Sequence, residues 1–233
     1  MDMTTIISEI GVNWNGNFDL LHQMVEKSKK IGCDLVKFQS IDVTNLKHPK
    51  KEIIVKSSIT EENIEKIDQI CKKNNIEWFC TPMYPEAVDF LNPYVKKFKI
   101  REFDGRVLLQ NKTNSILDKV MKTGKHVIIS SNQSPKKSKL FNSKQIDWLY
   151  CVPSYPCKLE QIDFSDIKDF NGYSNHCIEM IAPITAVSLG SKIIEIHMTS
   201  DKSKDFIDNN VSYDYSEFGE VVKQIRLLEK IKI

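Results

Sequence analysis

Two histidines, His176 and His197, come at the ends of two apolar segments that lie close together in the sequence. Neutral imidazole is a good ligand for divalent ions such as Mn²⁺, Fe²⁺, Co²⁺ and Zn²⁺. The pair therefore predicts a shared metal site, and two packed or hydrogen-bonded imidazoles are the alternative. His22, His48 and His126 have no comparable placement, so we expect them on the surface or in the framework.

Two lysines, Lys37 and Lys99, lie within otherwise apolar segments. A buried ammonium group is costly unless an anion compensates it. Each lysine is therefore expected to face a ligand or an acid, and a structural ion pair with Glu9 or Glu195 is the alternative. Lysines on such segments can also form Schiff bases with carbonyl substrates. Together with Arg101 and several nearby hydroxyl groups, the two lysines fit better a ligand that carries both a phosphate and a carboxylate.

Eight short apolar segments, most of them followed by an amphipathic stretch, must position these side chains. The expected strands are Thr5–Ile10, Asp34–Phe38, Glu77–Cys80, Lys97–Ile100, His126–Ser130, Asp147–Cys151, Phe170–Tyr173 and Ile193–His197. The expected helices are Leu20–Ile31, Thr60–Asn74, Pro85–Leu91, Asn114–Met121, Glu179–Leu189 and Glu217–Lys230. The segment Ser134–Lys144, between the fifth and sixth strands, is too short and polar for a fully packed helix.

Repeated strand–helix units require parallel strands joined by right-handed crossovers. Near-continuous apolar strands are typical of parallel strands that are buried on both faces. Eight of them in a chain of 233 residues favour an α/β fold of the TIM-type (β/α)8 barrel class, with an open doubly wound sheet as the alternative. Because no internal repeat or linker interrupts the pattern, we predict one barrel domain over residues 1–233.

In such a barrel the carboxyl ends of the strands carry the chemistry, so polar residues there become candidates. They are Glu9, Asn13, Lys37, Gln39, Thr81, Lys99, Arg101, Glu102, Ser130, Ser131, Asn132, Tyr155, Ser174, Asn175, His176, Glu195, His197 and Thr199. The sequence contains no glycine-rich phosphate loop of the GxGxxG or GxxxxGK[ST] type, which argues against a nucleotide cofactor. It also lacks the G-x-S-x-G elbow of one large hydrolase class.

The composition is that of a globular protein, with 41% apolar and 27% charged residues. A net charge of +2 predicts neither nucleic acid nor an anionic membrane as a partner. No apolar run approaches the ~18 residues of a membrane span, and the first residues lack the pattern of a signal peptide. We therefore expect a cytoplasmic protein whose six cysteines are reduced and structural.

From about Thr4 to Glu229, the chain resembles the N-acetylneuraminate (sialic acid) synthase family. It opens with E-I-G-x-N and then G-x-D-x-V-K-x-Q, as that family does. WFCTPMYP is similar to the family's S-T-P-F segment, FKI to Y-K-I, and CVPSYP to C-T-x-x-Y-P. The most specific matches are GYSNHC, which is similar to G-x-S-D-H-T, and AVSLGSKIIEIHMT, which is similar to A-V-A-L-G-A-x-x-I-E-x-H-F-T.

The resemblance implies an enzyme that condenses phosphoenolpyruvate with an N-acetylmannosamine-like amino sugar, or a related aldose, and releases phosphate. A divalent metal, Mn²⁺ or Mg²⁺, would activate the aldehyde and water, with His176 and His197 as its ligands. The implied catalytic residues are Glu9, Lys37, Gln39 and Glu195. The implied substrate-binding residues are Thr81, Lys99, Arg101, Ser130, Tyr155, Ser174 and Asp208.

Several positions depart from the family's pattern. K-I-x-S-G-E reads Lys99–Asp104, so that Glu102 replaces a serine where phosphate should bind. Two further segments differ, Asn13–Gly16 where the family has N-H-x-G and Ser130–Gln133 where it has S-T-G-M. Val152 replaces the Thr of C-T-x-x-Y-P, and Asn175 replaces the Asp of G-x-S-D-H-T. The segment Phe206–Asn209 keeps only Asp208 of the family's G-P-D-H. The family's C-terminal antifreeze-like domain is expected to be absent, so that a homodimer would rest on the barrel surface.

These departures leave two alternatives to an active synthase. The first is another enzyme on the same barrel, such as a lyase or an aldolase with a different anionic substrate, favoured by Arg101 and Glu102. The second is a barrel without catalysis that binds a sugar or a protein partner.

Overall fold

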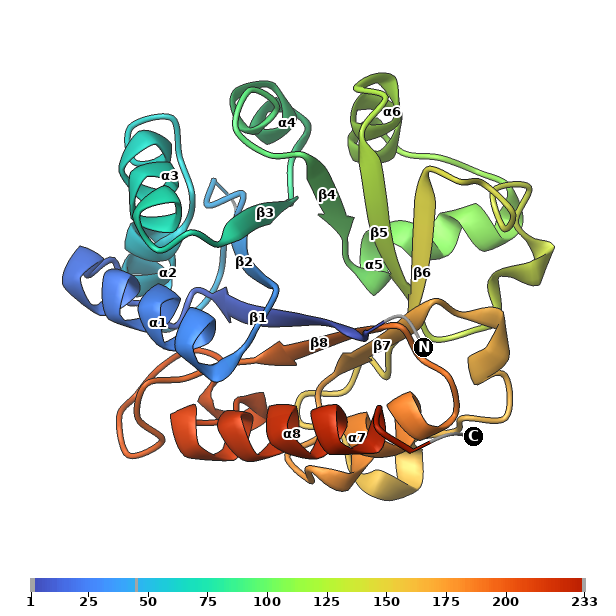
Figure 1. Cartoon of the computed structure of the whole chain (residues 1–233). Helices are drawn as coiled ribbons and strands as arrows, with labels where there is room; N and C mark the ends of the chain where they lie inside the picture. Colours follow the sequence, from blue (N-terminus) through green and yellow to red (C-terminus); the bar gives the residue numbers. More distant parts are fainter. Residues whose placement is uncertain (1–2, 45, 232–233) are drawn as a thin grey trace.

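Eight parallel strands form a closed barrel in chain order, from β1 to β8, in the computed structural model (Figure 1). The structure describes residues 3–44 and 46–231. The strands are β1 (Thr5–Gly11), β2 (Leu35–Ser40), β3 (Glu77–Pro82), β4 (Lys97–Ile100), β5 (His126–Ser131), β6 (Ile146–Tyr150), β7 (Gly172–Asn175) and β8 (Ile193–His197). The ring closes where β8 pairs with β1, with Ile7 opposite Glu195. The predicted TIM-type barrel is thus confirmed.

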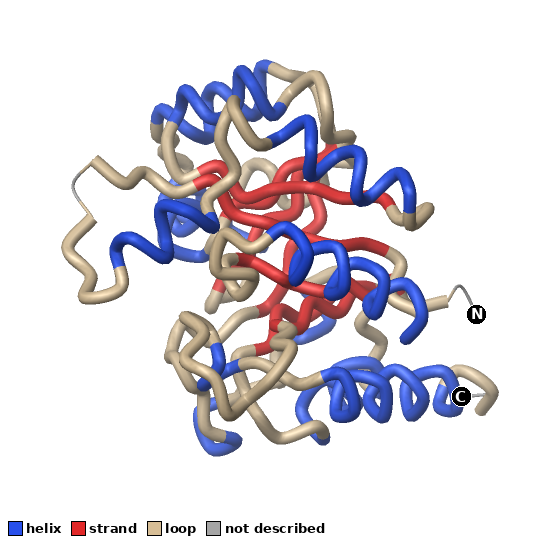
Figure 2. Tube along the Cα trace, turned by 90° about the vertical axis from the view of Figure 1, so that its left-hand side faces the viewer, coloured by secondary structure: helices blue, strands red, loops and turns tan. Residues whose placement is uncertain are grey.

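Helices surround the strands on the outside of the barrel (Figure 2). They are α1 (Phe18–Ile31), α2 (Lys51–Ser57), α3 (Ile64–Lys73), α4 (Pro85–Leu91), α5 (Glu102–Gly105), α6 (Ser115–Lys122), α7 (Ile181–Ser188) and α8 (Tyr215–Leu228). The Asn17 side chain caps α1 by accepting two backbone N–H bonds, and Gly32 ends that helix in the left-handed conformation. Glu229, just after α8, accepts a hydrogen bond from the backbone N–H of Thr4, which ties the last helix to the first strand.

Many boundaries differ from the sequence prediction, mostly by one or two residues, and two of the shifts have a local cause. Strand β7 begins at Gly172, two residues later than predicted, because Phe170 packs its ring against Tyr150 outside the strand. Helix α3 begins at Ile64 and not at Thr60, because the Asn63 side chain accepts the backbone N–H of Thr60 and closes a turn there. The short helices α2 and α5 were not predicted. Between β5 and β6 the chain forms only a 3-10 turn, Pro135–Lys137, which confirms the predicted shortened segment.

The alternation of side chains along each strand separates apolar from polar groups. In β8, Ile194 and Ile196 belong to the apolar core, whereas Glu195 and His197 line a cavity. In β2, Lys37 lines the same cavity and its neighbours Val36 and Phe38 are in the core. Successive strand residues point to opposite faces of a sheet. A two-residue period therefore delivers the polar side chains into the barrel.

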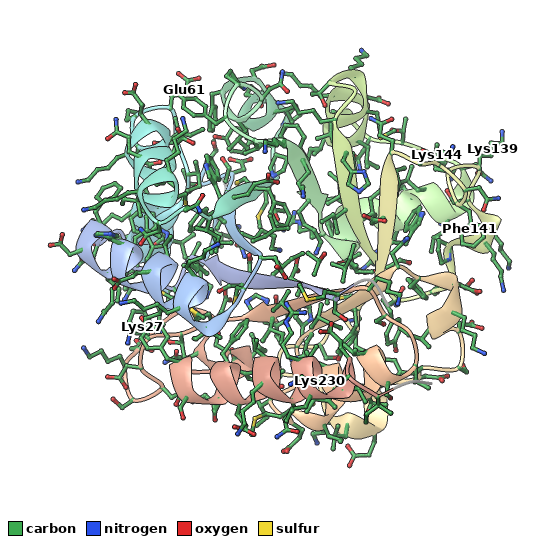
Figure 3. The ribbon with its side chains drawn as sticks, in the orientation of Figure 1. Lys27, Glu61, Lys139, Phe141, Lys144 and Lys230 are labelled. Atoms are coloured by element: carbon green, nitrogen blue, oxygen red, sulfur yellow. The ribbon has the colours of Figure 1, made fainter. Side chains whose placement is uncertain are left out.

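Charged side chains lie on the periphery of the ribbon, where Glu61, Lys139 and Lys144 are exposed to solvent (Figure 3). Such a surface is typical of charged groups that stay hydrated. Among the described residues, the longest apolar stretch of any helix falls short of what is needed to cross a membrane.

Candidate active site

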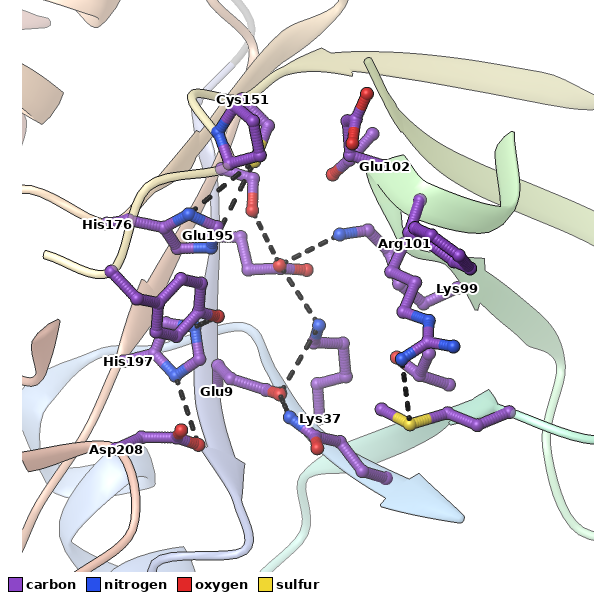
Figure 4. Close-up of a pocket in the computed structure, with 18 of the residues that line it drawn as sticks. Glu9, Lys37, Lys99, Arg101, Glu102, Cys151, His176, Glu195, His197 and Asp208 are labelled. Atoms are coloured by element: carbon purple, nitrogen blue, oxygen red, sulfur yellow. Dashed lines mark hydrogen bonds and ion pairs between the residues drawn. The ribbon is translucent and has the colours of Figure 1, made fainter. Parts of the chain in front are cut away.

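A cavity of about 430 Å³ lies at the carboxyl ends of the strands (Figure 4). Every residue to which the family resemblance gives a role lines it: Glu9, Lys37, Gln39, Thr81, Lys99, Arg101, Ser130, Tyr155, Ser174, His176, Glu195, His197 and Asp208. These side chains come from all eight strands or from the segments that follow them. The structure therefore brings these candidates together in one cavity.

The inner end of the cavity is an ion-pair cluster of Lys37, Lys99, Ser174 and Glu195, hereafter the inner cluster. One carboxylate oxygen of Glu195, Oε1, accepts hydrogen bonds from Lys37 Nζ at 3.0 Å, Lys99 Nζ at 2.9 Å and Ser174 Oγ at 2.8 Å. All four residues are buried. The other oxygen, Oε2, has no partner among the described residues. The ion pair foreseen as the alternative for both lysines is thus present.

The inner cluster shifts the pKa values of its members in opposite directions. Burial alone would raise the pKa of Glu195, but the two ammonium groups hold it well below its usual range. Burial lowers the pKa of Lys99, against the attraction of Glu195. Burial also opposes the charge of Lys37, but Glu195 and Glu9 raise the pKa of this lysine. The cluster therefore holds a permanent carboxylate and a strongly protonated Lys37, whereas Lys99 gives up its proton more readily.

Three further polar side chains converge over the bare Cα atom of Gly11. A Cβ atom at this position would lie 3.1 Å from both Gln39 Nε2 and Glu9 Oε1, and 3.3 Å from Asp208 Oδ2. The Gln39 side chain donates to Glu9 Oε1 at 2.7 Å, and Lys37 Nζ lies 3.4 Å from the same oxygen. The left-handed φ of +53° at Gly11 also favours glycine. Gly11 thus makes room for the carboxylates and the amide.

The two carboxyl groups in this corner are poised to titrate near neutral pH. Burial raises the pKa of Glu9 to about 7, against the opposing charge of Lys37. Burial likewise raises the pKa of Asp208 to about 6, against the same lysine. A group whose pKa lies near the working pH can both accept and donate a proton. Glu9 is therefore suited to general acid–base work.

The two candidate metal ligands stand side by side, with ring centroids 5.4 Å apart. His176 donates its Nδ1 proton to the carbonyl oxygen of Val152 at 2.8 Å, which leaves the Nε2 lone pair free. The Tyr155 hydroxyl lies 3.0 Å from His197 Nε2, and Asp208 Oδ2 lies 3.7 Å from Nδ1. Burial lowers the pKa of His176 to about 4 and that of His197 well below its usual range, so both rings stay neutral.

Neutral imidazoles are the form that binds metals. Two imidazole nitrogens suit a divalent ion of the Mn²⁺ type. No group of three or more His, Cys, Asp and Glu side chains closes around one point within residues 3–44 and 46–231. A metal held by His176 and His197 would thus take its remaining ligands largely from water and substrate, as an open catalytic site does.

Two buried hydroxyl groups in the cavity wall lack a partner. Thr81 Oγ1 and Ser130 Oγ are buried and make no hydrogen bond within the described part of the chain. Buried polar groups are nearly always hydrogen-bonded in folded proteins. Their position in the wall of the cavity that Lys37 and Lys99 also line points to a ligand with several acceptor oxygens.

The outer end of the cavity is formed by the segment after β4, with Arg101, Glu102, Phe103 and Arg106, hereafter the outer rim. Arg101 forms an ion pair with Asp104, and Arg106 forms one with Glu102. Both guanidinium groups lie near the exposed Phe103 ring, at 5.4 and 5.3 Å from its centroid. These are cation–π distances. The outer rim therefore offers cations, a buried carboxylate and an apolar ring within one short segment.

Five residues that line the cavity were not among the sequence candidates: Met83, Phe103, Arg106, Cys151 and Pro153. Glu102 was a candidate for its place after a strand and for replacing a serine of the family's pattern, but it was not assigned a role in the site. Conversely, Asn13 and Asn175 follow or end strands but serve the framework. The Asn13 amide donates to the Met198 carbonyl and to Ser212 Oγ. The Asn175 amide donates to the Cys177 carbonyl.

All six cysteines are free and buried, as predicted. One of them, Cys151, lines the cavity, with its sulfur 3.7 Å from His176 Nδ1. Burial raises its pKa to about 12, so the thiol stays protonated. The sequence could not separate cavity residues from framework residues by their place after a strand. Whether such a side chain points into the barrel depends on the exact residue at which the strand ends.

Comparison with known proteins finds relatives that include sugar-acid synthases. It is 35% identical to an uncharacterized protein of Methanocaldococcus jannaschii, over 98% of this chain and 72% of that protein. It is 29% identical to N,N'-diacetyllegionaminic acid synthase of Campylobacter jejuni, over 99% of this chain and 78% of the relative. A solved N-acetylneuraminic acid (sialic acid) synthetase of Leptospira borgpetersenii has the same fold, with a TM-score of 0.84, 24% identity, and coverage of 98% and 85%.

The family model of the NeuB family matches residues 24–232, which is nearly the whole chain. This match covers both histidines and every strand except β1, and it agrees with the resemblance drawn from the motifs. The chain belongs to the NeuB family.

Proposed function

We propose that this chain is an enzyme that condenses phosphoenolpyruvate with an N-acetylmannosamine-like amino sugar, or a related aldose. The product would be a nonulosonic or related 2-keto acid, released together with phosphate. One observation carries the proposal: two buried ammonium groups and two unpartnered hydroxyl groups face the same cavity as two neutral imidazoles. That combination suits an anion beside a metal-bound carbonyl. The relatives named as sugar-acid synthases support the same class.

The anionic donor would lie between the inner cluster and the unpartnered hydroxyls. Lys37 and Lys99 already share the single oxygen Glu195 Oε1, so both ammonium groups are held in place before a ligand binds. Thr81 and Ser130 supply hydroxyl donors without giving up existing hydrogen bonds. Preorganised donors stabilise charge without reorganisation during the reaction. This arrangement favours a ligand with phosphate and carboxylate oxygens.

The acceptor aldehyde would lie against the two histidines, which would hold Mn²⁺ or Mg²⁺. When bound, a divalent metal polarises a carbonyl oxygen and lowers the pKa of water. Tyr155 contacts both imidazole rings and positions its hydroxyl on His197, so it borders the same space. Gln39 and Asp208 face this space from the Gly11 corner.

Carbon–carbon bond formation would join carbon 3 of phosphoenolpyruvate to the aldehyde carbon, whose oxygen becomes a hydroxyl on taking up a proton. Water then adds to carbon 2, and the carbon–oxygen bond to phosphate breaks as the 2-keto acid forms. Glu9 titrates near pH 7 and lies within reach of Lys37 and Gln39, so it is the best placed group to exchange these protons. Glu195 would keep both lysines oriented throughout.

The test is phosphate release from phosphoenolpyruvate with Mn²⁺ and a panel of aldoses that includes N-acetylmannosamine. Aldose-dependent release, lost in His197→Ala, is the expected result. The same variant should also lose Mn²⁺ binding, which electron paramagnetic resonance measures without turnover. Folded, metal-loaded protein that releases no phosphate with any aldose would overturn the synthase and favour a barrel that only binds sugar or protein.

A second candidate, a lyase or aldolase, is favoured by the lowered pKa of Lys99. Burial makes this amine a better nucleophile than an ordinary lysine. It could condense with a substrate carbonyl to give an imine and water. Reduction of such an imine by borohydride would leave a stable adduct on Lys99, which peptide mapping detects. Such an adduct, absent in Lys99→Met, would favour the lyase over the synthase.

A further inference from the structure

Four acidic side chains among the described residues line the cavity, and Glu102 is the one that the outer rim contributes. Its side chain is only 6% exposed, and it lines the cavity at the first position of α5. It lies close enough to Cys151, deep in the same wall, to act on that thiol by its charge. The outer rim thus places a carboxylate in the same cavity as Lys99 and Ser130.

An unmasked carboxylate here would oppose the binding of any anion. Two like charges a few ångströms apart repel strongly where little water screens them. Burial of the carboxylate would also be unfavourable in itself without a counter-charge. The cavity can accept an anionic ligand only if the charge of Glu102 is cancelled.

Arg106 supplies that counter-charge from the next turn of the chain. Its Nη2 donates to Glu102 Oε2, and its guanidinium lies 5.3 Å from the centroid of the Phe103 ring. Arg101 lies at 5.4 Å from the same ring and is itself paired with Asp104, so it is not available to Glu102. Among the described residues, Arg106 is the only ion-pair partner of Glu102.

We propose that the Glu102–Arg106 ion pair determines the charge of the ligand that this cavity accepts, with Arg106 masking a carboxylate that would otherwise exclude an anionic donor. The proposal rests on the proposed function in one respect, the anionic donor. Arg106 is here a positioning residue that acts through Glu102, and it need not touch the ligand.

The sign of the effect follows from the charges. Removal of Arg106 alone leaves a bare carboxylate in the wall and should weaken anion binding. Removal of Glu102 alone leaves an additional free cation and should leave binding unchanged or tighter. Removal of both restores the original balance. Only masking predicts that removal of Glu102 restores the anion binding lost on removal of Arg106. A double-mutant cycle isolates this interaction between the two residues.

The experiment is isothermal titration of phosphoenolpyruvate, without an aldose, into the full chain and into Arg106→Gln, Glu102→Gln and the double variant. We expect Kd to rise at least tenfold in Arg106→Gln, to stay within threefold or to fall in Glu102→Gln, and to return within threefold of the wild type in the double variant. Lys112→Gln is the matched control, because it also removes one cation from the chain shortly after α5. Lys112 is exposed and makes no ion pair among the described residues. Thermal unfolding establishes that each variant is folded.

Three outcomes would overturn the inference. A Kd for Arg106→Gln within twofold of the wild type would show that no masking takes place. A double variant as weak as Arg106→Gln would show that Arg106 contacts the ligand directly. If the wild-type protein does not bind phosphoenolpyruvate at millimolar concentration, the proposed donor fails, and this inference fails with it. If the wild type binds phosphoenolpyruvate and all four proteins have the same Kd, the inference is overturned but the proposed function still stands.

Discussion

The inner cluster and the outer rim border one cavity but are built in opposite ways. The inner cluster consists of side chains from four different strands that bond to each other across the barrel. In the outer rim, each guanidinium pairs with a carboxylate three or four residues away in its own segment. The inner cluster is nearly inaccessible, whereas Phe103 in the rim is 65% exposed.

This difference separates two tasks. Groups that are held across the barrel cannot move without disturbing several strands, so they suit chemistry that needs fixed positions. Groups held within one turn can be exchanged with little effect on the fold, so they suit the choice of ligand. If the comparison is right, substitutions in the inner cluster should cost both stability and turnover, and substitutions in the outer rim should act mainly on ligand binding, with a smaller cost in stability.

The largest effect is expected from Glu195→Gln. The substitution leaves the buried Lys99 without its carboxylate partner and leaves Lys37 with Glu9 alone, 3.4 Å away. Removal of one partner of a buried ion pair typically costs about 3–5 kcal/mol. For a chain of this size that corresponds to a fall in Tm of roughly 6–20 °C. Turnover should fall at least ~1,000-fold, because the groups that orient the donor are lost. Calorimetry and phosphate release measure the two effects.

A double substitution sharpens this prediction. Glu195→Gln combined with Lys99→Met also removes the ammonium group that Glu195 alone had paired among the described residues. The double variant should regain part of the lost Tm without regaining turnover. A Glu195→Gln protein with the wild-type Tm would contradict the view that the inner cluster joins stability to catalysis.

A smaller effect is expected from Gly11→Ala. The new methyl group would meet Gln39 Nε2 and Glu9 Oε1 at 3.1 Å and must push both away. We expect kcat to fall ~10–100-fold, since small displacements of catalytic groups are costly, with a lesser change in the KM for phosphoenolpyruvate. Gly124→Ala is the matched control, because φ is +72° there and nothing lies within 4 Å of the added Cβ. Equal losses of kcat in both variants would assign the effect to backbone strain alone.

Titration of Glu9 tests the inner end of the cavity through pH. In the unfolded chain this carboxyl ionises at 4.5, and in the folded protein at about 7, so between these pH values the native state binds more protons. The contribution of this group to the free energy of unfolding is therefore fully present below pH 4.5 and is lost as the pH rises through 7. Asp208 acts in the same sense, whereas His176, with a pKa of about 4, favours folding as the pH rises from 4 to 6.5.

Comparison of Glu9→Gln with the wild type isolates the contribution of Glu9. As the pH rises from 5 to 8, the wild type loses the stabilisation from Glu9 and the variant does not. The free energy of unfolding of the variant should therefore increase relative to that of the wild type, by ~3 kcal/mol at most. Denaturant titrations at several pH values measure it. The exposed Glu86→Gln shows what the loss of one surface carboxylate does under the same conditions. A difference between Glu9→Gln and the wild type that does not change with pH would mean that Glu9 ionises at its ordinary pKa in the fold.

Strand periodicity explains why the inner cluster could be predicted from the sequence. Lys37 and Glu195 interrupt apolar runs at positions that a two-residue period sends into the barrel. All eight strands and the closed barrel followed from the same apolar runs. In the outer rim, Arg101 and Glu102 were candidates because they directly follow a strand. Phe103 and Arg106 could not be found from periodicity, because α5 is only four residues long. Nor could the sequence show that Arg106 reaches back to Glu102, since that contact depends on the turn between α5 and the next 3-10 helix.

The smallest effect on stability is expected from Phe103→Ala in the outer rim. An exposed ring contributes little to the core, and loss of two cation–π contacts at a solvated site costs about 0.5–1 kcal/mol each at most. Phe98, fully buried in β4 five residues earlier, is the internal comparison, and Phe98→Ala should cost about 3–5 kcal/mol. Because Phe103 lines the cavity beside Arg106 and is exposed, its removal should instead raise the KM for phosphoenolpyruvate several-fold. A large fall in Tm for Phe103→Ala would mean that the rim supports the barrel, and that fold and ligand choice are not separated in this molecule.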